Sequence, residues 1–323
     1  MISTLELARH CKVSQGTVDR ALHNRAGISP ATRERILAAA STFGFRPHPA
    51  AREIITGKSM TLHAIVPAVN NVFFMDVIHA LSEAMQERNL QFQISIVRDE
   101  AALLRTLADS AARRHQMVII IPPKDNITIP ADLTIHMPVV SLFSPCLGEN
   151  VTFISPDEVD TGREGVDYLV SKGHRKIVFL SFTRTSYAIS ARSEGYQTRM
   201  RELKLQPQVY SQMSGNQLLE VLETDQPTAF FCHNDWLAIR TILSLRECGI
   251  RVPEDISVLG VDNSPTLSGI CPELTTLSYP TPAIIDSVVA VLDGAVPVGI
   301  KTPLAIIERN SVQPRTNGKR LRR

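Results

Sequence analysis

The sequence predicts two unlike parts: an all-α head of three short helices, and an α/β body in which parallel sheets with crossover helices form two lobes. Capped helical patterns in the head are the first observation behind this prediction. The second is the alternation of short apolar runs with amphipathic segments from Leu62 onward. The third is charge: the first 58 residues carry a net +5, the last nine carry +5, and the remainder carries −8. A basic head on an acidic body predicts that the head binds a polyanion.

The composition bounds the class of protein. With 323 residues, 44% of them apolar, the chain is long enough to form more than one buried core. No early apolar run precedes a cleavage site and no apolar stretch is long enough to cross a bilayer, so a cytoplasmic location is expected. The five cysteines lie far apart, with neither C-x-x-C pairs nor zinc-site spacing. We therefore expect reduced thiols, and neither a metal nor a cofactor.

The head, residues 1–46, is predicted to hold three helices, each with its own start signal. Ser3 and Glu6 form a capping-box pattern at the start of the first helix. Ser14 caps the second helix, and Ser29, whose next residue is a proline, caps the third. Apolar residues at helical spacing give the last two helices buried faces: Val18, Ala21 and Leu22 in the second, and Ile36, Ala40 and Phe43 in the third.

The first two helices, joined by a short turn, form a helix-turn-helix, a motif that places its second helix in the major groove of DNA. Gln15 and Arg20 have the reach and the hydrogen-bonding groups to read base edges, and Gly16 permits close approach. Ser14 and Thr17 are better placed to contact phosphates. Short helical hairpins also occur as plain packing units, so this alternative stays open from the pattern alone.

A family resemblance covers the whole head. The stretch TLELARHCKVSQGTVDRALHNRAGISPATRERILAAASTFGFRPHPAAREIITGKS resembles the DNA-binding head and hinge of the lactose-repressor (LacI-type) family of bacterial transcription regulators. The resemblance implies that the segment from about Gln15 to His23 is the reading helix. Lys12 departs from the pattern, because many relatives have glycine there, and this implies a lysine held at positive φ.

Residues 47–60 are expected to form a hinge that becomes one short helix only when something packs on it. The resemblance implies that this partner is the minor groove together with the hinge of a second subunit. Ala51 then faces the groove, and Ile54 acts as an apolar wedge between base steps. A flexible spacer with incidental isoleucines is the alternative.

The body, residues 61–314, shows two similar series of strands and helices. The first lobe is expected at about 61–154 and 280–303, and the second at about 155–279 and 304–314, followed by a basic tail at 315–323. Predicted strands are LHAIVPA, FQISIV, MVIIIPP and VVSLF in the first series, and KIVFLS, QVYSQ, TAFFC and ISVLGV in the second. Predicted helices lie near 75–89, 100–113, 160–172, 191–203, 215–223 and 235–248.

The body also resembles the LacI-type family, whose core is similar to periplasmic binding proteins. The resemblance is carried by NNVFF, GHRKIVFLS, ARSEGY, CHNDWLAI, VPEDISVLGVDN and PELTTLSYP, which occur in family order. It implies an effector site between the lobes, with Arg192 forking onto hydroxyls or a carboxylate. The other implied effector residues are two polar ones, Asn234 and Asp262, and five aromatic ones, Phe73, Phe74, Phe143, Trp236 and Tyr279. From the residues alone, Phe73 or Phe74 is equally compatible with the core, Trp236 with a lobe edge, and Asp262 with a turn cap.

Two positions depart from the pocket pattern of relatives. Phe143 stands where several have aspartate, and Tyr279 stands where glutamine is common. Both changes replace an amide or carboxylate with a ring. They suggest an effector less hydroxyl-rich than a hexose, or one bound in another pose.

These observations predict a DNA-binding transcription regulator, a repressor of sugar or related carbon-source genes. It would act as a homodimer on a roughly palindromic operator and respond to a small molecule, a sugar or sugar derivative. From the sequence, binding of this molecule could either release or tighten the hold on DNA. The alternatives are a regulator that senses a protein partner or that activates, a solute-binding protein, or an enzyme on the same scaffold. The sequence has no dinucleotide fingerprint, G-x-S-x-G elbow or H-E-x-x-H motif to support an enzyme.

Overall fold

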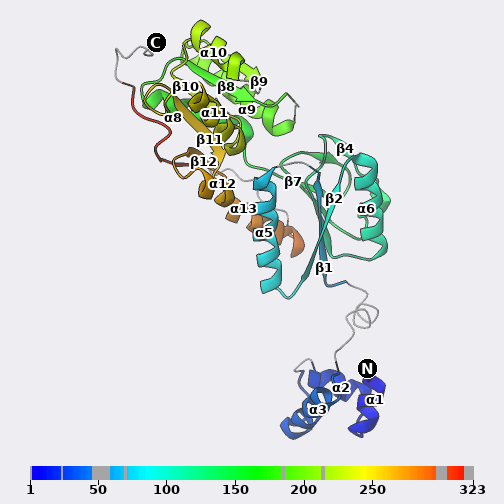
Figure 1. Ribbon diagram of the computed structural model, residues 1–323. Coiled ribbons are helices and arrows are strands. Elements are labelled where there is room, and N and C mark those ends of the chain that lie inside the picture. Colours follow the sequence, from blue (N-terminus) through cyan, green and yellow to red (C-terminus); the bar gives the residue numbers. More distant parts are fainter. Residues whose placement is uncertain are drawn as a thin grey trace. The chain divides into compact units, whose positions relative to one another are not determined.

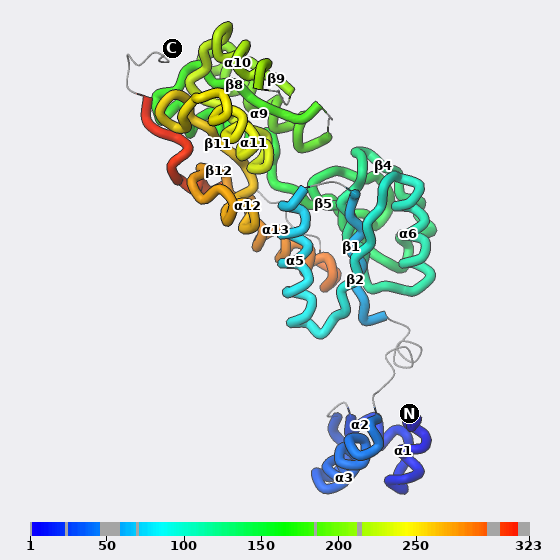
Figure 2. Tube along the Cα trace, viewed as in Figure 1, coloured from blue at the N-terminus to red at the C-terminus, as the bar shows by residue number. Residues whose placement is uncertain are grey.

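In the computed structural model of this chain, two compact units are present, residues 1–59 and 60–323 (Figure 1, Figure 2). The first is all-α, and the second is built on two largely parallel sheets, so the predicted fold class is confirmed. The structure describes residues 2–22, 25–45, 59–68, 71–183, 186–211, 215–295 and 304–315.

The head consists of three helices: α1 (Thr4–His10), α2 (Gln15–Leu22) and α3 (Pro30–Thr42). The capping box at α1 is present, because the Ser3 hydroxyl accepts from the Glu6 N–H and the Glu6 carboxylate accepts from the Ser3 N–H at 2.7 Å. Ser29 caps α3 by accepting from the Thr32 N–H at 3.2 Å. Seven side chains form a small buried core between the helices: Leu7, Ala8, Cys11, Val18, Ala21, Ile36 and Ala40.

One predicted core residue of the head lies elsewhere. Phe43 is 41% exposed, because α3 ends at Thr42 and Phe43 is its C-cap residue. Its ring lies edge-on to His10, with 4.5 Å between centroids, while Phe45 packs against the core. The prediction of Phe43 as a buried residue of the third helix was therefore wrong, because the helix ends one residue before it.

The first sheet of the body has the order β2-β1-β3-β5-β7 and is parallel throughout. Strands β1, β3 and β5 are buried on both faces, as expected for a sheet covered by helices on either side. Alternate residues of β1 show the two sides: Ala64 packs in the cluster that contains helix α5, and Ile65 packs in the cluster that contains helix α6. The bounds are β1 (Thr61–Pro67), α5 (Val72–Glu87), β2 (Gln91–Val97), α6 (Glu100–Ala112), β3 (Met117–Ile120), β5 (Val139–Leu142) and β7 (Val151–Ile154).

The second sheet has the order β13-β12-β11-β10-β8-β9, parallel except for β13, which runs antiparallel to β12. Its elements are α8 (Glu158–Ser171), β8 (Ile177–Ser181), α9 (Tyr187–Glu202), β9 (Gln208–Ser211), α10 (Gly215–Thr224), β10 (Ala229–Cys232), α11 (Asp235–Glu247), β11 (Ser257–Asp262), α12 (Pro265–Ile270), β12 (Thr275–Ser278) and β13 (Ala305–Ile307). A two-stranded ribbon, β4 (Ile127–Thr128) with β6 (Cys146–Leu147), and helix α7 (Ala131–Thr134) complete the part before α8.

The chain passes between the two sheets more than once. After β12 of the second sheet, α13 (Thr281–Leu292) contacts α5 and β7 of the first sheet. The chain then returns, and β13 pairs with β12. The eight strands and six helices predicted for the body are all present within a few residues, whereas β4, β6, β7, β12, β13 and the helices α7, α12 and α13 were not predicted.

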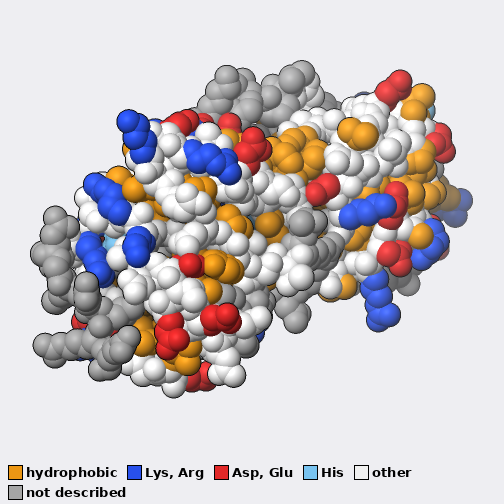
Figure 3. Space-filling model, turned by 90° about the horizontal axis from the view of Figure 1, so that it is seen from above, with side chains coloured by type: hydrophobic (Ala, Val, Ile, Leu, Met, Phe, Trp, Pro, Cys, Tyr) orange, Lys and Arg blue, Asp and Glu red, His pale blue; other side chains and the backbone are white. Residues whose placement is uncertain are grey.

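The exposed surface mixes charged and apolar side chains. Figure 3 shows acidic, basic and hydrophobic side chains interspersed on the face that it displays. All five cysteines are free thiols, and four of them are buried. Within the described ranges, no helix is both long enough and apolar enough to cross a membrane.

Candidate functional site

The predicted reading helix presents its polar side chains to solvent. Gln15, Gly16 and Arg20 of α2 are all exposed, while Val18 and Ala21 on the other side are buried. Helix α2 thus has one face that packs in the head and one that is free to contact DNA. The structure brings the three predicted base-reading positions together on that exposed face.

The two predicted phosphate contacts lie at the start of the same helix. The Ser14 hydroxyl accepts from the Thr17 N–H at 3.2 Å and shares a hydrogen bond with the Thr17 hydroxyl at 2.9 Å. Ser14 therefore caps α2 as predicted. Lys12, in the turn before it, has φ of 50°, which is the left-handed conformation that the resemblance implied for this position.

The predicted hinge contacts, Ala51 and Ile54, lie outside the described residues, as do residues 316–323 of the basic tail.

All eight predicted effector residues line one cavity of about 280 Å³ in the body. They come from the carboxyl ends of strands or the helix starts that follow, which is where parallel sheets bind ligands. Phe73 and Phe74 lie in the first turn of α5, and Phe143 follows β5. The residues that belong to the second sheet and its helices are Arg192 in α9, Asn234 and Trp236 at the start of α11, Asp262 at the end of β11 and Tyr279 after β12.

Four aromatic rings pack into one wall of this cavity. Phe73 contacts Tyr279 edge-on with centroids 4.9 Å apart, and Phe74 stacks on Phe143 at 5.6 Å. Phe143 has φ of 63°, a conformation that L-residues seldom adopt. Phe73 is both a core residue and a cavity residue, the two alternatives considered from sequence. It is 4% exposed, packs in the core and lines the cavity.

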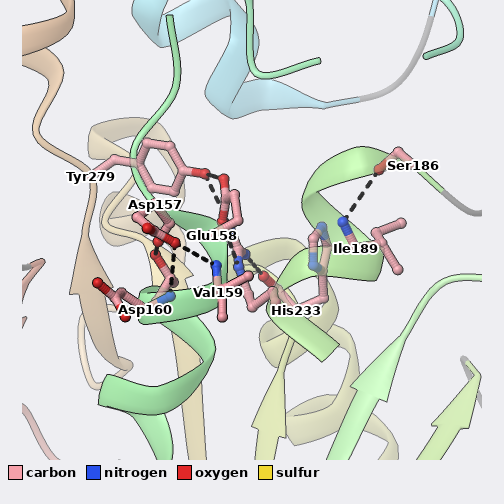
Figure 4. Close-up of polar contacts among 10 residues, drawn as sticks. Asp157, Glu158, Val159, Asp160, Ser186, Ile189, His233 and Tyr279 are labelled. Carbon is pink, nitrogen blue, oxygen red and sulfur yellow. Dashed lines mark hydrogen bonds and ion pairs between the residues drawn. The ribbon is translucent and has the colours of Figure 1, made fainter. Parts of the chain in front are cut away.

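The side chain of Arg192 forms its hydrogen bonds with other residues of the protein. Its Nε and Nη2 donate to the same carboxylate oxygen of Glu158, at 3.0 and 2.5 Å, and Nη2 also donates to the Tyr279 hydroxyl at 2.9 Å. Nη1 donates to the backbone carbonyl of His233, and the Tyr279 hydroxyl donates to the second oxygen of Glu158 (Figure 4). The fork that was predicted to hold an effector carboxylate or hydroxyls thus holds Glu158.

Burial and charge act together in this triad of Arg192, Glu158 and Tyr279. Arg192 is 2% exposed and Glu158 is fully buried. Burial alone would lower the pKa of Arg192, but the neighbouring Glu158 carboxylate raises it above the ordinary value. Burial, followed by the charge of Glu158, raises the pKa of the Tyr279 hydroxyl well above its usual range. The triad therefore contains a charged guanidinium, its carboxylate and a neutral phenol.

Glycines allow the triad to form, because they let α8 and α9 approach closely. A Cβ on Gly195 would lie 2.8 Å from the carbonyl carbon of Val159, and closer still to its oxygen. A Cβ on Gly162 would lie 2.7 Å from the backbone nitrogen of Tyr196. The backbones of the two helices are thus in direct contact where α8 carries Glu158 and α9 carries Arg192.

Asp262 contrasts with Arg192, because its side chain has no hydrogen-bond partner among the described residues. It is 7% exposed and lines the cavity. Burial, and then the nearby Asp235 carboxylate, raise the pKa of Asp262 well above its usual range. Asp235 itself accepts from the Thr276 hydroxyl at 2.6 Å and the Ser264 N–H at 3.2 Å, and burial raises its pKa to about 7.

This acid pair predicts how stability depends on pH. Because both carboxyl pKa values in the folded body lie above the ordinary value for aspartate, the folded body binds protons more tightly than the unfolded chain. The stabilisation is complete below about pH 4 and is lost as the pH rises through 7. We expect Asp262→Asn to reduce the loss of unfolding free energy between pH 5 and pH 8 by about 1 kcal/mol or more. Urea unfolding at each pH measures this.

Two features allow the difference between the pH curves of wild type and Asp262→Asn to be assigned to the acid pair. The buried histidines His63 and His174, whose pKa burial lowers to about 4, titrate alike in both proteins. Asp160→Asn, at an exposed carboxyl, should follow the wild-type curve. Parallel pH curves for wild type and Asp262→Asn would contradict the prediction.

Sequence reasoning missed several residues of the site. Glu158 is the foremost, because the pair Asp157–Glu158 resembles an ordinary helix start, and Asp157 does cap α8. His233 and Phe182 line the cavity itself, and the His233 Nδ1 is buried with no hydrogen-bond partner in the part of the chain that the structure describes. A signal for His233 was available, since it precedes Asn234 in a motif that directly follows a buried strand.

A polar contact also joins helices that flank different sheets. Asp76 of α5 accepts from the Thr266 hydroxyl of α12 at 2.7 Å, and it also accepts from the Ser264 hydroxyl. Ser264 in turn donates its N–H to Asp235. The contact between α5 and α12 is therefore linked to the acid pair beside the cavity.

Comparisons with known proteins agree with this architecture. Residues 5–48 match the model of "Bacterial regulatory proteins, lacI family", and residues 166–315 match a "Periplasmic binding protein-like domain". The NTD biosynthesis operon regulator NtdR of Bacillus subtilis is 26% identical over 285 residues, which cover 85% of this chain and 87% of that protein. The transcriptional repressor CytR of Escherichia coli is 27% identical over 292 residues, with 85% and 84% covered.

Solved structures show the same fold. The lac repressor dimer bound to operator and the anti-inducer ONPF superposes with a TM-score of 0.79 at 22% identity, covering 97% of this chain and 99% of that one. The regulator CelR in complex with cellobiose superposes with a TM-score of 0.61 at 21% identity, with 96% and 100% covered. The chain thus joins a head that matches the lacI-family model to a body that matches the periplasmic binding protein-like model, and over most of its length it is similar to lacI-family regulators.

Proposed function

We propose that this chain is a repressor whose hold on operator DNA is controlled by a small molecule in the cavity of the body. One observation carries the proposal: a head with an exposed polar reading helix precedes a body whose cavity is lined from both sheets. The match of residues 5–48 to the model of lacI-family regulatory proteins supports the role of the head. The effector-controlled part is supported by the cavity and its uncommitted polar groups.

Two copies are proposed to act together on a roughly palindromic operator. A single helix-turn-helix reads one half-site, and a two-fold dimer matches two half-sites about one helical turn apart. The lac repressor of similar fold is a dimer on its operator. Ala51 and Ile54 are proposed minor-groove contacts, Gln15, Gly16 and Arg20 base contacts, and Ser14 and Thr17 phosphate contacts.

The cavity can affect DNA binding only if the ligand prefers one of two arrangements of the body. The hydrogen bonds of Asp76 with Thr266 and Ser264 join α5 to α12, so they must adjust if the two sheets move apart. A ligand that contacts both Phe74 and Asp262 would bridge the same two sheets. Its binding energy would then favour one arrangement over the other.

A footprint on the DNA that flanks the coding region of this chain tests the function. Full-length protein should protect one roughly symmetric site, and adding a cell metabolite extract should change the protein concentration needed for protection. Protection that the extract never alters would contradict effector control. Equal affinity for every duplex would contradict sequence-specific binding.

Arg20→Ala tests the reading helix. We expect it to lower the preference for the protected site over unrelated DNA by roughly 1–3 kcal/mol, while salt-dependent nonspecific binding stays largely intact. Titration of labelled operator in the presence of competitor DNA measures that preference. Arg35→Ala, at an exposed position of α3, removes the same charge and should keep the preference. Equal losses in the two variants would remove Arg20 from the reading set.

A further inference from the structure

We propose that the cavity excludes anionic ligands and accepts an uncharged or amine-bearing ring compound. The reason is that Glu158 already forms an ion pair with Arg192 and neutralises its charge. This inference rests on the proposed function, in which the cavity binds the effector. It separates neutral sugars, amino sugars and similar rings from sugar phosphates and sugar acids. Glu158 is the specificity-determining residue.

The first step is the occupancy of Arg192. Four of its five N–H groups are taken: one from Nε, two from Nη2 and one from Nη1. The acceptors are Glu158, the Tyr279 hydroxyl and the His233 carbonyl, all of which are protein groups. An anion that entered the cavity would have to displace a fully buried carboxylate that accepts two hydrogen bonds from Arg192 at one oxygen and a third from Tyr279 at the other.

The second step is the charge of the other lining residues. Lys124 is the other basic residue of the lining, and its Nζ lies 2.5 Å from the Glu100 carboxylate. Burial lowers the pKa of His233 well below its ordinary value, so this imidazole is neutral. Asp125 and Asp262 add carboxyl groups to the lining. Lys124 is 61% exposed and pairs with Glu100 at the surface, so among the described residues the buried part of the lining holds no unpaired cation. An anion there would be desolvated without a compensating charge, which is unfavourable.

The third step is what the cavity leaves open to a ligand. The carboxyl of Asp262 is unpartnered among the described residues and 7% exposed. Its raised pKa favours the protonated form, which can donate to a ligand hydroxyl or amine as well as accept from one. The buried Nδ1 of His233 is also unpartnered. The Asn234 side chain accepts from the Leu237 N–H at 3.0 Å through its oxygen, which leaves its amide hydrogens for a ligand. Trp236 is 37% exposed, and aromatic faces favour ring C–H groups and cations.

The test uses one substitution that should change the cavity from excluding anions to binding them. Glu158→Gln keeps the size of the side chain and removes the charge, so Arg192 should become available to an anion. Inorganic phosphate is the probe, compared with chloride at equal ionic strength. The chain has a single tryptophan, Trp236, which lies in the cavity wall, so its fluorescence reports on the body and not on phosphate bound by the basic head.

Wild type and the control Asp160→Asn should show no phosphate-dependent change in Trp236 emission or in the melting temperature that it reports. Glu158→Gln should have a lower melting temperature than wild type, and phosphate should restore it. Its affinity for phosphate should be about tenfold or more above that of wild type. The gain should disappear in Glu158→Gln/Arg192→Met. Phosphate binding by wild type that Arg192→Met abolishes, or a folded Glu158→Gln without the gain, would overturn the proposal.

A second measurement uses wild type alone, in case Glu158→Gln fails to fold. The metabolite extract is passed over an anion-exchange resin, and both fractions are tested in the footprint. Activity in the flow-through supports the inference. Activity confined to the retained anions overturns it while leaving effector control intact. Activity in neither fraction rejects effector control, and this inference with it.

Discussion

Replacing Gly195 with alanine is expected to lower the free energy of unfolding of the body by about 3 kcal/mol, the upper end of overpacking costs. The new Cβ would lie 2.8 Å from the carbonyl carbon of Val159 and closer still to its oxygen. Both are backbone atoms of α8, so no side chain can rotate away. The helices must separate instead.

That separation should also affect the cavity. Val159 follows Glu158 directly, and Gly195 lies one helical turn from Arg192. Moving α9 away from α8 lengthens the contacts of the triad, so the variant should lose its response to the metabolite extract. Urea unfolding monitored by Trp236 fluorescence measures the stability change.

Gly269→Ala is the matched control, because Gly269 is also helical and a Cβ there meets nothing within 4 Å. We expect its unfolding free energy to stay within about 0.5 kcal/mol of wild type. If Gly195→Ala unfolds at the same urea concentration as Gly269→Ala, the close packing of α8 and α9 does not limit stability.

Replacing Ile36 with alanine is expected to abolish operator binding by unfolding the head. Ile36 is fully buried, and truncating such a side chain costs about 2–5 kcal/mol. Because the head core has seven buried side chains among the described residues, its stability margin is small. The body has separate cores and should be unaffected.

Operator titration and limited proteolysis of the head measure this outcome, while the Trp236 transition reports on the body. Leu37→Ala removes almost the same side chain from the next position, where leucine is 44% exposed. It should retain operator binding. Full binding by Ile36→Ala, or equal losses in both variants, would show that α3 does not hold the head together in this way.

Local patterns accounted for most of the elements. Serine caps and helical spacing predicted α1, α2 and α3, and apolar runs predicted the strands of both sheets, because these signals act over a few neighbouring residues. The elements that were missed are short or depend on distant partners. Strand β13 is an example, since it exists through pairing with β12 across α13.

The residues that line the cavity were predicted better than the interactions among them. All eight proposed effector residues line it, because the motifs that carry the family resemblance place most of them after a strand or at the start of a helix, and Arg192 in the second turn of α9. The role of Arg192 differs from the expectation, since the fork binds Glu158. The fully buried state of Glu158 has no local signature, because Asp157 and Glu158 together look like an ordinary acidic helix start.

Residue type and short-range spacing by themselves determined that this chain has a helix-turn-helix head and a two-lobed α/β body, and the family resemblance added the set of cavity residues. Only the tertiary structure decided which charges in that cavity are free. Glu158 lies 34 positions before Arg192 and meets it because glycines let α8 and α9 touch. Asp262, which also lines the cavity, has no side-chain hydrogen-bond partner among the described residues, and burial and then the nearby Asp235 raise its pKa. Charge balance in a buried site depends on three-dimensional neighbours, and spacing along the chain does not contain that information.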